Sequence, residues 1–185
     1  MAGVVVVFVA MDVARVVGRL ADFLDAEGAP LALVGAHAFL AYGVTRSTVD
    51  LDLLTEQRVQ DRLVRFLESL GYETLHRSDG YSNHLHADPT WGRVDVVYVD
   101  ERTSDVLFGG AREVATIGGR ALKLPRPEHL VAMKVQAVKN DPERTLKDLS
   151  DIRDLLRVAE VDEAEVRAYF ERAGLGARYE DVRRR

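Results

Sequence analysis

Two aspartates, Asp50 and Asp52, alternate with leucines in the apolar segment 49–54. Alternation with a period of two is typical of a β-strand with one buried face, and it places both carboxylates on the opposite face. Two like charges at this spacing repel each other, and burial makes their charged forms costlier still. The segment therefore predicts a strand that is anchored by its leucines and that carries two acids needing either solvent or a cation.

The hydrophobic periodicity of the rest of the chain predicts an α+β fold, a small mixed β-sheet flanked by helices with a C-terminal helical part. We expect an α/β core over residues 1–124 and a helical region packed on it over 125–185. Strands are expected at 31–35, 49–54, 72–76, 82–87 and 93–99, and as a hairpin over 113–124 around Gly118-Gly119. Helices are expected at 12–27, 36–42, 57–70, 103–108, 127–140, 142–158 and 162–173, and a solvated basic tail at 183–185.

Composition excludes several classes of protein. The chain has 185 residues, which suits one domain, and a formal net charge of −5, which argues against a protein that coats duplex nucleic acid but not against a locally basic groove. Since it contains no cysteine, disulfides, thiolate metal sites and cysteine catalysis are excluded. Any metal must therefore be bound by oxygen or imidazole ligands.

The apolar N-terminal run, residues 1–11, superficially resembles a signal peptide. It lacks a basic start and is too short to span a bilayer, so we expect a cytoplasmic protein without a membrane partner. The run is either a strand or a stretch ahead of a start at Met11, and the sequence does not decide between the two.

A third acid, Asp95, stands between Val94 and Val96 in the strand-like segment 93–99. If this strand pairs beside segment 49–54, all three acids converge and can hold Mg²⁺ or Mn²⁺, the ions that oxygen ligands favour. Such a set suits in-line phosphoryl or nucleotidyl transfer. The alternative, solvated aspartates on an exposed edge strand, stays open because the Asp-x-Asp pattern is common.

Residues that precede the two acids in the sequence are candidates for binding phosphate. Gly35 and Ala36 join a predicted strand to a predicted helix, and such a junction presents backbone N–H groups and a positive helix end. Arg46, Ser47 and Thr48 directly precede the acids, and an arginine can bind a triphosphate through two hydrogen bonds. Each has a simpler interpretation, because a tight turn needs a glycine, arginine is common at surfaces, and serine and threonine are common in turns.

Read together, these motifs resemble the DNA polymerase β-like nucleotidyltransferase superfamily. The resemblance consists of Gly35-Ala36, thirteen intervening residues, Asp50-Leu51-Asp52-Leu53 and the later Asp95. The segment 33–54 is similar to the minimal bacterial branch that includes abortive-infection type IV toxins. The helix 143–156 carries the Arg-x-x-Lys-Asp-x-x-Asp pattern frequent in that branch. The motifs cover residues 31–54, 93–99 and 125–156.

The resemblance implies an NTP donor, Mg²⁺ dependence, and metal-ligand and catalytic roles for the three acids. It also implies phosphate-binding roles for Gly35, Ala36 and the residues 46–48, and it makes Lys134 and Lys147 candidates for the nucleotide phosphates. Asp148 and Asp151 would orient Lys147 or shape the acceptor site. Many members have Gly-Gly or Gly-Ser where this chain has Gly35-Ala36, so a hydroxyl donor is missing.

Transfer of NMP to a hydroxyl is the function that the resemblance implies, with a tRNA 3′ end, a protein or a small molecule as acceptor. A toxin paired with an antitoxin protein is one such role. Two alternatives stay open: a non-catalytic module that binds a nucleotide or a partner, and a metal-dependent phosphodiesterase that uses the same acids.

Overall fold

The computed structural model describes residues 10–45 and 48–183. In these residues the strands are β1 (Ala32–Leu33), β2 (Asp50–Glu56), β3 (Tyr72–Ser78), β4 (Tyr81–His86), β5 (Arg93–Val99), β6 (Arg112–Ile117) and β7 (Arg120–Leu124). The helices are α1 (Val13–Ala26), α2 (Gly35–Ala41), α3 (Gln60–Ser69), α4 (Glu101–Gly109), α5 (Pro127–Asn140), α6 (Thr145–Val158), α7 (Glu163–Arg172) and α8 (Gly176–Arg183). Two 3₁₀ turns, η1 (Gln57–Val59) and η2 (Pro142–Arg144), precede α3 and α6.

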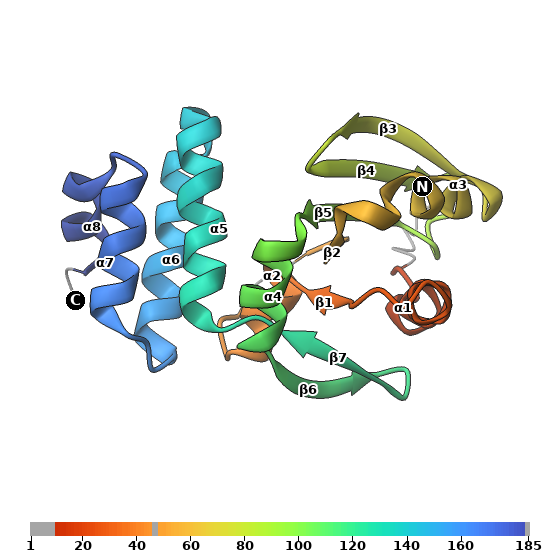
Figure 1. The fold of residues 1–185 in the computed structure, drawn as a ribbon, viewed down its shortest axis with the longest axis horizontal. Coiled ribbons are helices and arrows are strands. Elements are labelled where there is room, and N and C mark those ends of the chain that lie inside the picture. Colours follow the sequence, from red (N-terminus) through yellow and green to blue (C-terminus); the bar gives the residue numbers. More distant parts are fainter. Residues whose placement is uncertain (1–9, 46–47, 184–185) are drawn as a thin grey trace, which may run out of the picture.

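The strands of the described chain form one mixed sheet in the order β3-β4-β5-β2-β1-β7-β6 (Figure 1). Strand β2 runs parallel to β5, and β1 runs parallel to β7, whereas the other neighbours are antiparallel. The predicted α+β fold, a mixed sheet flanked by helices, is confirmed. The predicted hairpin at Gly118-Gly119 is the β6–β7 turn, in which both glycines have positive φ.

Each face of the sheet is covered by its own group of helices. Helices α1 and α3 pack on the face that carries Leu51 and Leu53 of β2 and Val94 and Val96 of β5. The opposite face carries Leu54, which belongs to a second apolar cluster with residues of α2 and α4–α8. In Figure 1, α5–α8 stand together on one side of the sheet. The strand containing the acids therefore has one buried face, carrying Leu51 and Leu53, as its alternation predicts.

The C-terminal helices are joined to the sheet by a short connection. Pro127 occupies the first turn of α5, where its missing N–H costs nothing. The hydroxyl of Tyr42 donates to the carbonyl oxygen of Pro125 at 2.8 Å, which ties this connection to the end of α2. Helix α8, with Tyr179 and Val182 buried, was not predicted. Of the expected solvated tail at 183–185, only Arg183 is described; it is exposed and ends α8.

Within the part of the chain that the structure describes, no helix is both long and apolar enough to cross a bilayer. The segment 1–9 lies outside the described residues, and so do the last two residues. The interpretation of the apolar N-terminal run therefore stays a prediction.

A buried histidine lies in the β3–β4 end of the sheet. His84 is fully buried, and its ring nitrogens lie 2.7 Å from the Ser82 hydroxyl and 3.1 Å from that of Thr74. Burial is the main reason that the pKa of His84 lies below its usual value of 6.5, although Glu68 and Asp95 oppose the shift. The native state therefore disfavours the protonated form of this ring.

We expect this histidine to make the fold less stable in mild acid. Because its pKa is lower in the folded state, the unfolded chain binds more protons below pH 6.5, and the free energy of unfolding falls as the pH drops through that value. Urea unfolding at pH values from about 7.5 to about 5 should show a shallower loss in His84→Gln than in the wild type. His76→Gln, at an exposed position of β3, is the control. If the free energy of unfolding falls equally with decreasing pH in all three proteins, the prediction is contradicted.

Candidate active site

Two of the three predicted acids face each other across neighbouring strands. In the parallel pairing of β2 with β5, Asp52 lies directly opposite Asp95, about 4.8 Å away along the hydrogen-bonding direction. Asp50 precedes Asp52 by two residues and projects from the same face, opposite to the buried Leu51. The predicted pairing of the two acid-bearing strands is confirmed, and it brings all three carboxylates to one face of the sheet, near the starts of these two inner strands.

The carboxylate of Asp52 packs directly against the turn between β1 and α2. The backbone N–H of Val34 donates to the Asp52 carbonyl oxygen at 3.1 Å. Gly35 follows with φ +56°, and a Cβ atom added there would lie 2.0 Å from Oδ2 of Asp52. Only glycine fits at this position, because it alone adopts this φ readily and leaves room for the carboxylate.

The charged form of Asp52 is disfavoured, because nearby positive charge does not offset its burial and the repulsion from the other two acids. Burial, the largest cause, together with repulsion from Asp95 and Asp50, raises its pKa to about 6. A hydrogen bond from the backbone N–H of Ala36 and the positive charge of Lys134 oppose the rise. A bound divalent cation relieves repulsion of this kind.

The donor set fits Mg²⁺ by its chemistry, since it consists of carboxylate oxygens alone. In the described residues, no group of three acidic or histidine side chains is arranged so that it could hold a metal ion by itself. Mg²⁺ is typically held by one or two carboxylates together with substrate phosphates and water, not by a cage made only of protein. The metal roles of Asp50, Asp52 and Asp95 stay a prediction.

Asp95 is held by two neighbours that sequence reasoning missed. Its Oδ1 accepts a hydrogen bond from Nε of Arg93, which also pairs with it as an ion at 3.2 Å, and a short one from Nδ2 of Asn83. Arg93 precedes Asp95 by two residues in the same strand, so the alternation rule could have found it. Asn83 lies on β4, and only the register of β4 against β5 brings it to Asp95.

Of the three residues predicted to precede the acids, only Thr48 is described, whereas Arg46 and Ser47 lie outside the described residues. The Thr48 hydroxyl donates to the carbonyl oxygen of Asp50 at 3.0 Å and accepts from the Asp50 N–H at 3.3 Å. These contacts are those of a turn residue that shapes the start of β2. Thr48 also lines the cleft above the acids, so its predicted contact with phosphate stays a prediction.

The acids of the C-terminal motif hold a different lysine from the one expected. Nζ of Lys134, on α5, lies 2.7 Å from Asp148 and 2.8 Å from Asp151, and Arg144 pairs with Asp148 at 2.9 Å. The expectation that Asp148 and Asp151 orient Lys147 is wrong, because both acids are buried against α5 while Lys147 is exposed. The cause is the packing of α6 on α5, which the arc of a single helix does not reveal.

Lys134 links the C-terminal helices to the acids electrostatically. Burial, the largest cause, lowers its pKa, although Asp148 opposes the shift. Its charge in turn lowers the pKa of Asp52, and it lines the same cleft. Lys147 also lines this cleft. The roles of both lysines toward phosphate stay predictions.

We expect Lys134→Met to destabilise the fold by about 3–5 kcal/mol, because it leaves Asp148 and Asp151 buried without their shared cation. Lys139→Met, at an exposed position of the same helix, should change the free energy of unfolding little. Chemical unfolding of both variants measures the difference. Adding Asp148→Asn and Asp151→Asn to Lys134→Met should recover much of the loss; a Lys134→Met protein as stable as the control would show that the cluster contributes nothing.

The three acids, Lys134 and Lys147 line one cleft of about 1380 Å³ between the sheet and the helices α4, α5 and α6. One end is polar and contains the three acids with Arg93, Lys134 and other charged side chains. Farther along β5 the lining mixes apolar side chains with polar ones. The apolar residues there are Val97, Val99, Val106, Leu107, Leu130 and Met133, and the polar ones include Asp100, Arg102 and His129. Pockets for one drug-sized ligand are typically about 300–1000 Å³, so the cleft has room for more than a nucleotide.

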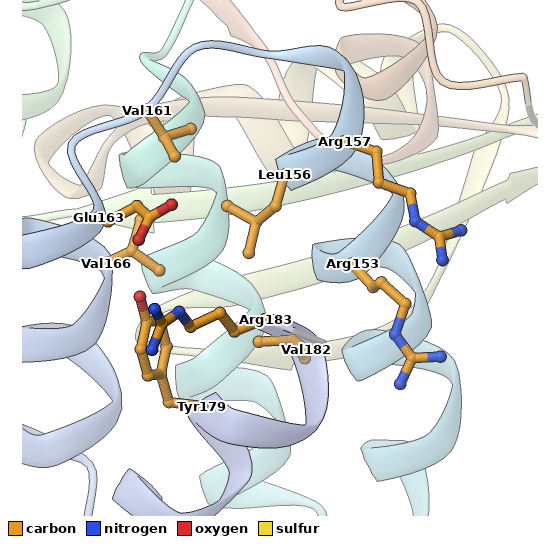
Figure 2. A pocket seen from close by; sticks show the side chains of 9 residues that line it. All are labelled: Arg153, Leu156, Arg157, Val161, Glu163, Val166, Tyr179, Val182 and Arg183. Carbon is orange, nitrogen blue, oxygen red and sulfur yellow. The ribbon is translucent and has the colours of Figure 1, made fainter. Parts of the chain in front are cut away.

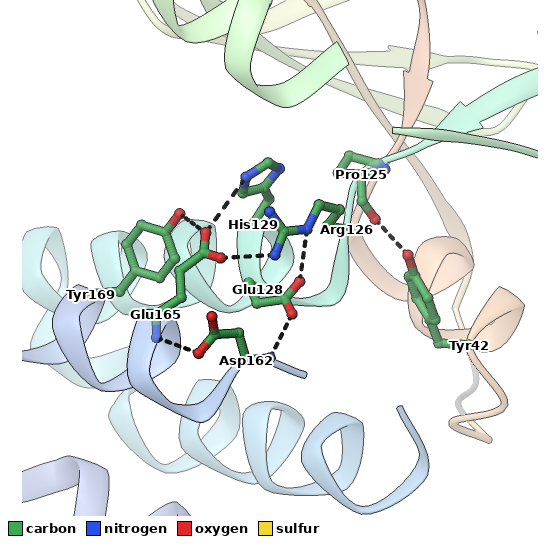
Figure 3. Close-up of polar contacts among 8 residues, drawn as sticks. All are labelled: Tyr42, Pro125, Arg126, Glu128, His129, Asp162, Glu165 and Tyr169. Atoms are coloured by element: carbon green, nitrogen blue, oxygen red, sulfur yellow. Dashed lines mark hydrogen bonds and ion pairs between the residues drawn. The ribbon is translucent and has the colours of Figure 1, made fainter. Parts of the chain in front are cut away.

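A network of polar contacts fixes the wall of the cleft that contains His129 and Tyr169 (Figure 3). Arg126 bridges Glu128 at 3.2 Å and Glu165 of α7 at 2.8 Å, while the Tyr169 hydroxyl donates to Glu165 at 2.8 Å. The buried carboxylate of Glu128 also accepts the N–H of Asp162, just before α7. These contacts hold α5 against α7, so that His129 and Tyr169 keep their places in the cleft wall.

A second cavity lies among α6, α7 and α8 and is far smaller, about 50 Å³ (Figure 2). Three arginines line it, but each has a partner nearby: Arg153 donates to a backbone oxygen at 2.8 Å, Arg157 pairs with Asp154 at 3.6 Å, and Arg183 pairs with Glu180 at 4.0 Å. It shares no lining residue with the cleft. The cleft is therefore the candidate active site.

Comparison with known proteins agrees with this geometry. No protein-family model matches the sequence, and no curated protein matches it. Among solved structures, that of the antibiotic-resistance factor ANT(2'')-Ia in solution matches with a TM-score of 0.63 and 19% identity, over 91% of this chain and 94% of that one. The fold is that of nucleotidyltransferases.

Further solved structures extend the likeness. The crystal structure of ANT(2'')-Ia in complex with adenylyl-2''-tobramycin matches with a TM-score of 0.61 and 19% identity, over 90% of this chain and 98% of that one. An antigenic nucleotidyltransferase-like protein from Paracoccidioides brasiliensis matches with a TM-score of 0.55 and 17% identity, over 91% and 92%. Lincomycin-bound LnuA, a lincosamide antibiotic adenylyltransferase, matches with a TM-score of 0.50 and 13% identity, over 78% and 97%. These matches show the fold, and none of these proteins is an abortive-infection toxin.

Proposed function

We propose that this protein is a Mg²⁺-dependent nucleotidyltransferase that transfers NMP from an NTP to a hydroxyl group of a small molecule. The observation that carries the proposal is the pairing of Asp52 with Asp95 across parallel strands, with Asp50 on the same face and a large cleft in front of them. Three acids at a cleft suit the charge changes of in-line nucleotidyl transfer.

In the proposed reaction, the acceptor hydroxyl oxygen forms a bond to the α-phosphorus of the NTP. The bond from that phosphorus to the oxygen bridging it to the β-phosphorus breaks, and pyrophosphate leaves with the electron pair. Mg²⁺ held by Asp50 and Asp52, with Asp95 as further ligand or as base, would lower the pKa of the attacking hydroxyl and neutralise the leaving group. Mn²⁺ would substitute for it.

The chain's own residues hold the substrates in this scheme. Lys134, kept in place by Asp148 and Asp151, supplies positive charge toward the phosphates from the α5 side of the cleft. Lys147 and the backbone N–H group of Gly35 contribute beside the acids. The proton of the acceptor hydroxyl passes to the carboxylate of Asp95 or to solvent.

A small-molecule acceptor is favoured by the shape and lining of the cleft. The apolar side chains that α4, α5 and the end of β5 contribute to its lining suit a ligand that buries carbon surface beside the nucleotide. The net charge of −5 offers little attraction for a long stretch of nucleic acid. The complexes with adenylyl-2''-tobramycin and with lincomycin show that proteins of similar fold take small acceptors.

Labelled-NTP transfer tests the proposal. Each of the four NTPs is incubated with Mg²⁺ and, separately, tobramycin, lincomycin, total tRNA and a protein lysate. Transfer to a small molecule that is lost in an Asp50→Ala/Asp52→Ala double variant supports the proposal. Labelling of tRNA or of a protein instead would point to a toxin-like role, for which an antitoxin partner is then sought by co-purification. No transfer to any acceptor, with the two proteins indistinguishable, would contradict it.

One observation favours a second candidate, a module that binds nucleotide without transferring it. Alanine at position 36 has no hydroxyl, and its backbone N–H already bonds to Asp52. Calorimetry with each NTP and Mg²⁺ separates the two: tight binding without any transfer supports the module, and turnover excludes it.

A further inference from the structure

Three side chains form a row across the sheet on the face that lines the cleft. Asn83 of β4 pairs directly with Asp95 of β5, which pairs directly with Asp52 of β2. Directly paired side chains on one face lie about 5 Å apart and interact. The row therefore places one neutral amide at the end of two carboxylates, on the side away from Gly35.

The contacts in this row are directional. Nδ2 of Asn83 donates to Oδ1 of Asp95, and Nε of Arg93 donates to the same oxygen at 3.2 Å. Both donors hold the Asp95 carboxylate by one oxygen, so neither contact uses Oδ2. A carboxylate held in this way has a fixed rotamer, and Oδ2 keeps a fixed place relative to Asp52.

The two donors are not equivalent. Asn83 is a buried residue, with 3% of its surface exposed, whereas the side chain of Arg93 is 41% exposed. A buried amide is costly unless it is hydrogen bonded, and asparagine is a poor strand former, so neither packing nor β-propensity explains an asparagine here. Its Nδ2 also lies 3.4 Å from the hydroxyl of Tyr81, which lines the cleft.

We propose that Asn83 is a positioning residue, which acts through Asp95 to fix the geometry of the reaction centre, with Arg93 as its solvent-facing counterpart. The inference rests on the proposed function, because it assigns Asn83 a part in that same site. It differs from a purely structural role in that the N–H donor is what matters, not the volume of the side chain. Partners that orient metal-ligating groups typically change metal affinity or activity by about 10–100-fold when removed.

Two substitutions separate donation from packing. Asn83→Leu keeps a similar volume without a donor, and Asn83→Asp keeps the shape but replaces the donor by a charge. We expect each to lower kcat by about 10–100-fold, with the KM for NTP changed by less than about threefold. Leu85→Ala, two residues along the same face of β4 and largely exposed, is the matched control and should match the wild type. Thermal unfolding shows whether each variant is folded.

Mn²⁺ affinity, measured by electron paramagnetic resonance without any NTP or acceptor, gives a readout that does not depend on turnover. We expect about tenfold weaker Mn²⁺ binding in Asn83→Leu than in Leu85→Ala. If the wild type transfers no nucleotide, the proposed function fails, and this titration alone decides the role of Asn83. A folded Asn83→Leu protein with wild-type kcat, or with wild-type Mn²⁺ affinity where no turnover exists, would overturn the inference; if Asn83→Leu does not fold, the same comparison is made with Asn83→Asp.

Discussion

Asp52→Asn is expected to lower kcat/KM for nucleotidyl transfer by about 10³-fold or more, because it removes the carboxylate at the centre of the acidic row. The same substitution is expected to stabilise the metal-free fold. Burial and repulsion from Asp95 and Asp50 disfavour the charged form of Asp52 in the native state, and an amide of the same shape removes both penalties. A residue that is required for activity yet costs stability is typical of a functional site.

The measurement is a pair of experiments on one protein preparation. Transfer kinetics with Mg²⁺ give the loss of activity, and urea unfolding in EDTA gives the gain in the free energy of unfolding, about 1–3 kcal/mol. Asp105→Asn, at an exposed position of α4 outside the lining of the cleft, should change neither quantity. An Asp52→Asn protein that retains activity within about threefold of the wild type would remove Asp52 from the reaction.

The two parts of the chain together build the site. The sheet supplies the carboxylates and the turn at Gly35, and the C-terminal helices supply Lys134. Two buried acids of α6 pair with the largely buried Lys134 and hold it where its charge reaches Asp52. Loss of the α5–α6 packing is therefore expected to impair the chemistry as well as the fold.

Local patterns predicted the parts of this site that depend on a single strand. Alternation of acids with leucines in β2 gave both the strand and the face on which Asp50 and Asp52 project, because the period of two is a property of the extended backbone. The pairing of β2 with β5 was predicted because Asp95 is also isolated among buried valines, and the structure confirms it.

The parts that depend on packing between elements were not predictable in the same way. Asn83 reaches Asp95 only through the register of β4 on β5, which no local pattern specifies. The partner of Asp148 and Asp151 is set by the packing of α6 on α5, so the sequence-adjacent Lys147 was a natural but wrong choice. Helix α8 was missed because Tyr179 and Val182 are its two buried residues, too few for a clear apolar stripe.

Gly35→Ala is expected to abolish transfer and to destabilise the fold, since the position combines two constraints: a positive φ and a lack of space for a Cβ atom beside Asp52. The backbone at Gly35 has φ +56°, and an alanine Cβ would lie 2.0 Å from Oδ2, 2.3 Å from Cγ and 2.6 Å from Cβ of Asp52. Because the methyl group meets the whole carboxylate and not only its flexible end, either Asp52 or the β1–α2 turn must move. A displacement of about 1 Å in a reacting group can cost about 10²-fold in rate.

Gly28→Ala separates the two constraints. Gly28 has nearly the same φ, +59°, but a Cβ atom there meets nothing within 4 Å, so it reports the backbone cost alone, about 1–2 kcal/mol. We expect Gly28→Ala to show that loss of stability with normal transfer, and Gly35→Ala to lose a further 1–3 kcal/mol from overpacking together with at least about 10²-fold in kcat/KM. Urea unfolding and transfer kinetics on the two variants measure the difference. If they prove equal in both quantities, the carboxylate of Asp52 does not pack against this turn, and the acidic row is not built on it.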